Sequence, residues 1–350
     1  MIEKLKKWNK GVISVLIAML LAVAAFVIII DPFWHFHGPV SGLSYPLKDE
    51  RYCNDGIARH SDYEAVIAGS SMTLNFKPSE FEKLFGTKTI KLAYSGASFK
   101  EVNEGLKKVY LYQPETKYIL RCLDISMLGD PGDDKSEYTD YLSDSNPFND
   151  FKYIFNKEVI LKSVNVLNYT RAGNKTPTPD EYASFSQYGE YGKESVLSKL
   201  LLDDIEYAVD EENFEIIEKN ITENVCALAK EHPETQFFIF FPPYSMAYWY
   251  KQYLGGTLDL RLKEEELAAR ILLEQKNIRV FSFHERLDIT ANLDNYQDLL
   301  HYGEWINSEI LLSVKEGLGE LTEENYVEYF KELKKVLSEY PYEEEFAKEE

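Results

Sequence analysis

Residues 65–71 read Ala-Val-Ile-Ala-Gly-Ser-Ser, an apolar run that leads directly into a glycine and two serines. A short, nearly continuous apolar run is typical of a strand covered on both faces in a parallel sheet. Strand candidates of this kind recur at residues 64–69, 89–93, 118–125, 236–241 and 278–283, and helical patterns lie at 101–112, 212–230, 258–276 and 305–317. The alternation predicts an α/β domain built on a doubly wound parallel sheet.

We expect this domain to cover residues 63–320. A segment at 129–210, rich in Tyr, Asn, Asp and Ser, interrupts it. Because so long a connection is usually functional or an inserted subdomain, we predict a helical cap over the site. Residues 31–62 are interpreted as a polar linker, in which Asn54-Asp55-Gly56 predicts a turn. Residues 321–350 form an acidic extension with a helical pattern.

Composition excludes some classes of function. The chain has 350 residues, 45% of them hydrophobic, which is enough for a sizeable core. Its formal net charge of -21 disfavours nucleic acid as a partner, because phosphates need a basic surface. The three cysteines are too scattered for a zinc site or a disulfide scaffold, which favours buried thiols and leaves one disulfide open: Cys53, Cys122 and Cys226. No metal or organic cofactor is implied.

A transmembrane anchor is predicted at residues 11–30, a run of twenty residues with no charge and Ser14 as its only hydroxyl. About twenty apolar residues cross a bilayer, whereas a cleaved signal peptide has an apolar stretch of roughly 7 to 15. Residues 1–10 carry four lysines and Asp31 follows the run. The positive-inside rule therefore predicts a cytoplasmic tail at 1–10 and an outward-facing remainder. Phe33, Trp34 and Phe36 suit the membrane interface.

Serine chemistry is the reaction class that the polar residues permit. A serine hydroxyl needs a base, and the base needs an orienting carboxylate. Of the six histidines, only His301 has an aspartate, Asp298, three residues earlier in what the pattern predicts to be one tight turn. Ser70 and Ser71 follow the first strand, at the sheet edge where α/β proteins bind ligands. Taken alone, the Asp-x-x-His pair is typical of a solvated surface rather than a catalytic site. The two serines alone are typical of a helix cap.

Three further stretches have two interpretations each. Gly96, in the turn after the second strand, is either an oxyanion donor or part of an ordinary strand-to-helix turn. Arg51 and Asn54 either line the pocket or belong to a hydrogen-bonded loop. The aromatic residues at 244–250, beginning with Tyr244, either stack on sugar rings or pack against the cap.

Together these motifs carry a resemblance. Gly69-Ser70-Ser71, Gly96 and Asp298-x-x-His301 resemble the SGNH (GDSL-type) hydrolase superfamily. More closely, RYCNDGIARH at 51–60, GSSMTLNF at 69–76 and DLLHYGEWIN at 298–307 resemble a group of membrane-anchored bacterial members of it. That group is similar to the factors involved in D-alanyl or acetyl ester transfer on cell-surface polymers.

The resemblance implies a three-layer α/β/α fold of the SGNH or flavodoxin type. It implies Ser71 as nucleophile, His301 as general base, Asp298 as its orienter, and the N–H groups of Ser71 and Gly96 as the oxyanion hole, with Ser70 nearby in the pocket. One position departs from the pattern. Typical members have an asparagine donor after the third strand, where this chain has Asp124. An ionised Asp124 would repel an oxyanion, so it points elsewhere, is protonated, or leaves a two-membered hole.

We therefore expect a single-pass, outward-facing serine esterase or O-acyltransferase. Its substrate would be an acetyl or D-alanyl ester of an envelope polysaccharide or teichoic acid, and a membrane-bound acyltransferase would be a partner. The alternative is a non-catalytic binding or scaffolding component of a complex that modifies such a polymer.

Overall fold

The structure is a computed structural model that describes residues 1–132, 146–201 and 214–346. The chain divides into two compact units. The N-terminal unit comprises residues 1–61 and 136–178, and the sheet unit comprises residues 62–135 and 179–350. The segment at 129–210 is thus shared between the two units. Its role as a cap stays a prediction, and residues 133–145 and 202–210 of it lie outside the described residues.

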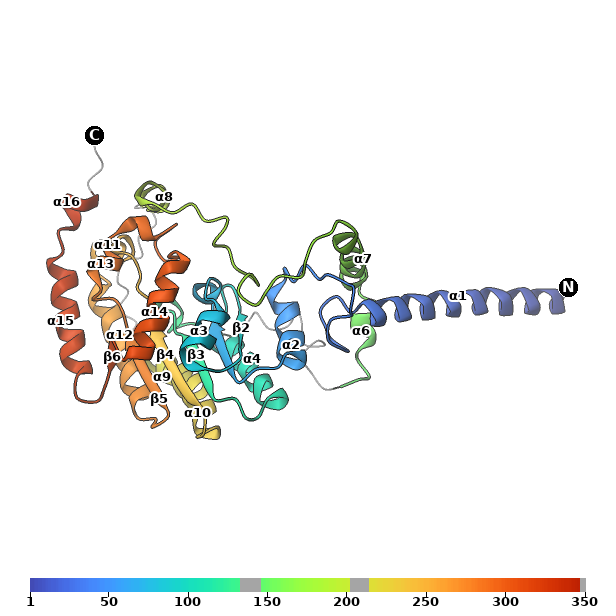
Figure 1. Ribbon diagram of the computed structural model, residues 1–350, viewed down its shortest axis with the longest axis horizontal. Helices are drawn as coiled ribbons and strands as arrows, with labels where there is room; N and C mark the ends of the chain where they lie inside the picture. The colour runs from blue at the N-terminus through green and yellow to red at the C-terminus, as the bar shows by residue number, and fades with distance from the viewer. Residues whose placement is uncertain (133–145, 202–213, 347–350) are drawn as a thin grey trace. The chain divides into compact units, whose positions relative to one another are not determined.

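The described helices of the N-terminal unit are α1 (Ile2–Ile30), α2 (Glu50–His60), α6 (Phe151–Ile154) and α7 (Lys157–Arg171), of which α1 is a single long helix (Figure 1). A buried carboxylate, that of Asp31, ends α1. It accepts hydrogen bonds from the backbone N–H groups of residues 35–37 at 2.7–2.9 Å and from the Tyr153 hydroxyl at 2.7 Å. Four donors on one carboxylate fix the chain where it leaves the apolar helix.

Helix α1 is long and apolar enough to cross a membrane, and a signal sequence near an N-terminus has the same length and composition. Its 29 residues span about 43 Å at 1.5 Å per residue, more than the hydrocarbon core of a bilayer. The direction of insertion stays a prediction.

Two local predictions in this unit are wrong. Residues 54–56 lie inside α2 and form no turn. Gly56 is needed for close packing instead, because a Cβ there would lie 2.0 Å from the Phe33 carbonyl oxygen. Phe33 and Trp34 are buried, at 5% and 9% exposure, so they do not face a membrane interface. Their rings pack on Tyr52 and Tyr45 of the same unit.

The sheet unit is mixed α/β, as the sequence predicts, with a sheet of six strands in the order β2-β1-β3-β4-β5-β6 (Figure 1). Their bounds are β1 (Ala65–Gly69), β2 (Thr89–Ala93), β3 (Tyr118–Cys122), β4 (Gln236–Phe241), β5 (Ile278–Ser282) and β6 (Glu320–Leu321). The first five strands pair in parallel, and the two-residue β6 pairs antiparallel with β5. All five predicted strands are present, and β6 is the strand that the sequence does not predict.

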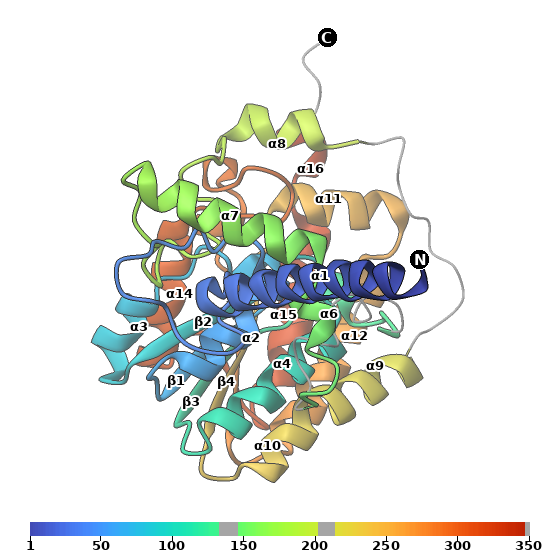
Figure 2. The same ribbon diagram turned by 90° about the vertical axis from the view of Figure 1, so that its right-hand side faces the viewer.

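Helices flank these strands. Their bounds are η1 (Ser71–Thr73), α3 (Pro78–Phe85), α4 (Phe99–Tyr112), η2 (Ile125–Met127), α8 (Lys193–Lys199), α9 (Phe214–Ile221), the π-helical η4 (Thr222–Cys226), α10 (Ala227–Glu231), α11 (Met246–Gly255), α12 (Leu258–Leu273), α13 (Leu287–Thr290), η5 (Leu293–Asn295), α14 (Glu304–Glu316), α15 (Tyr326–Glu339) and α16 (Tyr342–Phe346). Helix α3 packs on α14, and the two lie side by side in both views (Figures 1 and 2). Helix α12 packs on α9 and α15. The predicted C-terminal extension thus contains α15 and α16, and residues 347–350 lie outside the described residues.

Strand order determines where a site can form. The sheet grows from β1 in one direction to β2 and in the other to β3, so the connections leave β1 and β3 in opposite directions. A doubly wound sheet binds ligands beside the carboxyl ends of the strands at such a switch point. Ser70 and Ser71 follow β1 directly, and Asp124 lies two residues after the end of β3.

Candidate active site

The nucleophile end of the site is a tight turn between β1 and η1. Ser70 caps η1, its Oγ accepting the Met72 N–H at 3.3 Å, and Ser71 is the first residue of η1. Only glycine fits before them, because a Cβ on Gly69 would lie 2.7 Å from Thr73 Cγ2 and 2.9 Å from Cys122 Cβ. The turn therefore holds Ser71, which is half-buried, at the carboxyl end of β1.

The base end is a loop that leads into α14. Asp298 Oδ1 accepts the backbone N–H groups of Leu300 and His301, each at 2.8 Å, so the carboxylate closes a turn around the histidine. Tyr296 and Tyr302 flank this turn and form an antiparallel bridge. The loop thus holds the backbone of His301 independently of the contacts that its ring makes.

The structure brings Ser71, His301 and Asp298 into one hydrogen-bonded chain. Ser71 Oγ lies 2.8 Å from His301 Nε2, and His301 Nδ1 lies 2.8 Å from Asp298 Oδ2 and 3.0 Å from Oδ1. Burial raises the pKa of the Asp298 carboxyl, but hydrogen bonds from the His301 ring and from the backbone outweigh it and lower that pKa overall. An ionised Asp298 favours the tautomer that carries the proton on Nδ1, which leaves Nε2 free to accept the proton of Ser71.

Asp124 does not stand unpaired in the site. Its carboxyl accepts hydrogen bonds from the Ser70 hydroxyl on one oxygen and from the Tyr244 hydroxyl, at 2.8 Å, on the other. Asp124 is 5% exposed, and burial raises the pKa of its carboxyl. Of the alternatives that the sequence leaves open, this geometry favours an acid directed at two hydroxyl groups.

Gly96 lies in the turn after β2, beside the nucleophile turn. The Tyr94 N–H donates to the Gly69 carbonyl at 2.9 Å, and Gly96 itself is exposed with φ of +64°. Its role as an oxyanion donor, with the Ser71 N–H, stays a prediction. Arg51 and Asn54 belong to α2 in the N-terminal unit, and their role in a pocket also stays a prediction.

Residues 180–199, which we call the strap, lie within the segment predicted as a cap, but the sequence did not predict their contacts. Asn75, four residues after Ser71, accepts the Ser184 hydroxyl and the Phe185 N–H on its Oδ1, both at 3.0 Å. At the other end, the Gly192 N–H donates to the Tyr296 carbonyl at 2.9 Å. The strap therefore joins the nucleophile turn to the base loop. No local sequence pattern predicts these contacts, because they join residues more than a hundred positions apart in the sequence.

Lys91 on β2 supports the same arrangement from inside the fold. It is 1% exposed, and its Nζ donates to the carbonyl oxygens of Leu74, Phe76 at 3.0 Å and Asp180 at 3.3 Å. Burial lowers its pKa to about 7, and the charge of Asp180 opposes that change. One buried amine thus ties the chain after the nucleophile to the start of the strap.

The aromatic side chains of residues 244–250 are buried. Tyr244, Tyr248, Trp249 and Tyr250 are at most 8% exposed, so the sugar-stacking interpretation of this stretch is wrong. Tyr244 instead reaches Asp124 with its hydroxyl. Helix α11 carries the others into the core, where Trp249 and Tyr248 pack edge to face.

The cysteines are buried free thiols: Cys53, Cys122 and Cys226. Within residues 1–132, 146–201 and 214–346, no group of three His, Cys, Asp or Glu side chains is arranged to hold a metal ion.

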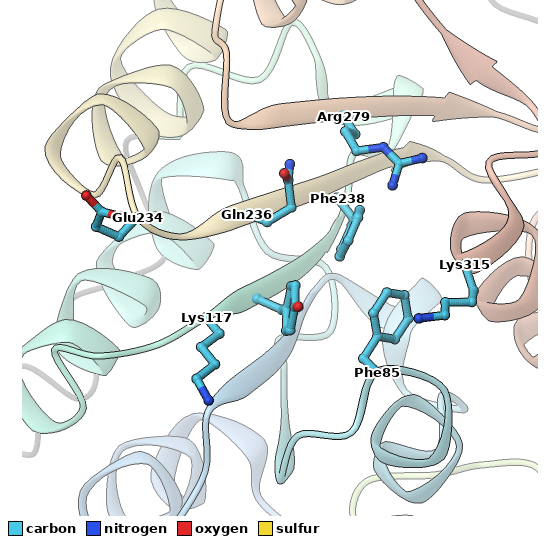
Figure 3. Close-up of a pocket in the computed structure, with 8 residues that line it drawn as sticks. Phe85, Lys117, Glu234, Gln236, Phe238, Arg279 and Lys315 are labelled. Carbon is cyan, nitrogen blue, oxygen red and sulfur yellow. The ribbon is translucent and has the colours of Figure 1, made fainter.

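A separate depression of about 490 Å³ lies at the amino ends of β3, β4 and β5 (Figure 3). Phe85 and Lys315 face each other there, with the Lys315 Nζ 4.8 Å from the ring centre. Its other cations are paired, Lys117 with Glu64 and Arg279 with Glu320. It lies at the opposite end of the strands from Ser71.

Comparison with known proteins gives little guidance. No protein-family profile matches the sequence, and no curated protein does. Four solved chains are similar in structure. One of them, provisionally described as a platelet activating factor from Streptococcus pneumonia, is 13% identical, covers 77% of this chain and 91% of its own length, and has a TM-score of 0.39. Neither the fold nor an activity is inferred from a likeness this weak.

Proposed function

We propose that this protein is a serine esterase or O-acyltransferase with a three-layer SGNH-type fold. The observation that supports the proposal is the chain of hydrogen bonds from Ser71 Oγ through the His301 ring to Asp298. Each contact lies within the reach that proton transfer requires, about 2.6 to 3.2 Å.

In the proposed reaction, Ser71 Oγ attacks the carbonyl carbon of an ester while its proton moves to His301 Nε2. Asp298 stabilises the imidazolium that forms and stays ionised. Backbone N–H groups of Ser71 and Gly96 would stabilise the oxyanion. The bond from carbon to the alcohol oxygen then breaks, and His301 returns the proton to that oxygen. In the second half of the reaction, water or a sugar hydroxyl attacks the acyl group on Ser71 while its proton moves to His301 Nε2. The bond from the acyl carbon to Ser71 Oγ then breaks, and His301 returns the proton to Ser71.

The proposed setting is the outer face of a cell membrane, with α1 as an uncleaved anchor and the tail at 1–10 in the cytoplasm. An anchor that ends at Ile30 keeps the domain near the membrane, where lipid-linked polymers and a membrane acyltransferase are found. The substrate would be an acetyl or D-alanyl ester of an envelope polysaccharide or teichoic acid. This assignment rests on the resemblance of the motifs.

A non-catalytic role is the second candidate. The observation that favours it is Asp124, because an acid occupies the position of an expected oxyanion donor, and losing one such donor costs about 2.7 to 4 kcal/mol in the barrier. A binding or scaffolding component would retain the fold and need no turnover.

A fluorophosphonate probe on the full-length protein in detergent separates these candidates. We expect labelling of the wild type and of Ser70→Ala, and none of Ser71→Ala. Turnover of p-nitrophenyl acetate and of acetylated polysaccharide should follow the labelling. Ser71→Ala with wild-type turnover would refute the enzyme, and a label on Ser70 would show that the neighbouring serine is the nucleophile.

A further inference from the structure

Beside the proposed triad, an exposed tryptophan is held in one position. Trp305, at the start of α14, is 43% exposed. Its Nε1 donates to Asn295 Oδ1 at 3.0 Å, and its ring lies flat against the backbone of Gly303, where a Cβ would be 2.3 Å from the ring. The Tyr191 ring packs against it, with centroids 5.1 Å apart at 62°. Two aromatic rings held together and partly exposed form a candidate binding surface, which a single exposed ring would not.

The strap brings further aromatic residues to the same side of the site. The Phe185 ring meets the His301 ring edge to face, with centroids 5.8 Å apart at 86°. Tyr188, three residues on, is 84% exposed, and its N–H donates to the Phe185 carbonyl at 2.9 Å. The Tyr191 ring and the Gln297 side chain both lie against Gly189, 2.7 Å and 2.9 Å from where its Cβ would be, which places Tyr191 close to the base loop.

The position of these rings indicates which half of an ester they meet. The alcohol oxygen must come within about 3 Å of His301 Nε2 to receive its proton. A ring in contact with the imidazole therefore flanks the alcohol, whereas the acyl group extends from Ser71. Polar side chains lie beside these rings, namely Asn295, Gln297 and Glu304, and Glu304 pairs with Lys77 at 3.3 Å. Such groups bind hydroxyls, and aromatic faces bind the apolar faces of sugar rings.

We propose that Trp305, Tyr191, Phe185 and Tyr188 form a subsite for a pyranose ring on the alcohol side of Ser71. The subsite deepens the proposed function, on which it rests, by naming the alcohol as a sugar. Water-facing rings separated by hydrogen-bonding groups differ from the continuous apolar channel that a lipid needs.

Binding is tested without turnover, in full-length Ser71→Ala protein in detergent. The probes are O-acetylated hexasaccharides of glucose, galactose, mannose and N-acetylglucosamine, and the readout is calorimetric Kd. We expect at least one probe to bind, Trp305→Ala and Tyr188→Ala each to raise its Kd about tenfold, and Trp305→Phe to restore most of the affinity. Phe148→Ala, which removes an aromatic side chain 89% exposed in the N-terminal unit, is the matched control and should change nothing.

Turnover gives a second readout in protein that retains Ser71. Trp305→Ala should raise KM for the bound sugar acetate about tenfold, and should raise KM for ethyl acetate, which has the same acyl group but no sugar, by much less. The subsite would be overturned if none of the four probes bound, or if Trp305→Ala left Kd unchanged. It would also be overturned if Trp305→Ala lost the same amount of activity on both esters. Failure of the proposed function would give a different result, in which Ser71→Ala turns over either ester as fast as the wild type does.

Discussion

The Ser70 hydroxyl donates to the Asp124 carboxyl and so joins the turn after β1 to the turn after β3. These two strands flank the switch point of the sheet. The bond fixes the residue that precedes the proposed nucleophile, and Tyr244 holds the same carboxyl from the far side. Asp124 is therefore a junction between three segments of the chain rather than an isolated acid.

Asp124→Asn should change the dependence of stability on pH. Burial raises the folded pKa of Asp124 above its unfolded value of about 3.9, so ionisation costs stability. Relative to the variant, the free energy of unfolding of the wild type is then highest below the unfolded pKa. It falls as pH rises through the folded pKa. Urea unfolding of both proteins from pH 3.5 to 8 measures the difference. A difference that stays constant with pH would contradict a raised pKa.

Asp298→Asn should lower kcat by about 10,000-fold with little loss of stability, because the amide favours the wrong tautomer of His301 but its oxygen still accepts two backbone N–H groups. Asp298→Ala should lose the same activity and also unfold at a lower temperature, because both N–H groups lose their acceptor. Thermal scans with ester kinetics compare the two. Equal melting temperatures for both variants would show that the turn does not depend on the carboxylate.

Gly69→Ala should destabilise the protein by about 1 to 3 kcal/mol, since the new methyl group meets Thr73 Cγ2. Thr73→Ser removes that carbon and keeps the hydroxyl that donates to the Ser70 carbonyl at 2.8 Å. The double variant should therefore be more stable than the sum of the single changes predicts. Denaturant unfolding of the four proteins completes the cycle, and strict additivity would place the strain elsewhere, for example at Cys122.

Lys91→Met should also shift the pH dependence of stability, in a different window. The folded pKa of Lys91 is lowered to about 7, against an unfolded value of about 10.4. Its charge therefore costs stability progressively as pH falls from about 10.4 to about 7, and no further below. We expect wild-type stability to decline over that window relative to the variant. Parallel curves from pH 6 to 10.5 would mean that the three carbonyl contacts keep the pKa at its ordinary value.

The strands could be predicted because each is a continuous apolar run, and β2 and β4 have the predicted bounds. Strand β6 could not, because two residues carry no periodicity. The order Ser71, Asp298, His301 suggested a triad, and the structure brings those side chains together. The strap could not be foreseen, because its register depends on a polar contact between Asn75 and Ser184 rather than on an apolar pattern.

Aromatic composition shows the same limit. Trp249 and Trp305 both lie near the start of a helix, yet one is fully buried and the other is 43% exposed. The sequence left sugar stacking open for the stretch that contains Trp249 and assigned no such role to Trp305. Which face of a helix meets the sheet is set by the whole fold, and a single aromatic residue does not reveal it.

The contact between Ser71 and His301 joins positions 230 residues apart in the chain. During synthesis or export from the N-terminus, the serine leaves the ribosome or translocon long before its base. Any partly emerged chain would therefore carry an unactivated hydroxyl, harmless to the esters around it. In the proposed enzyme, Ser71 would therefore become reactive only after the carboxyl-terminal third has folded, and a proteolytic cut in that third would abolish the reaction.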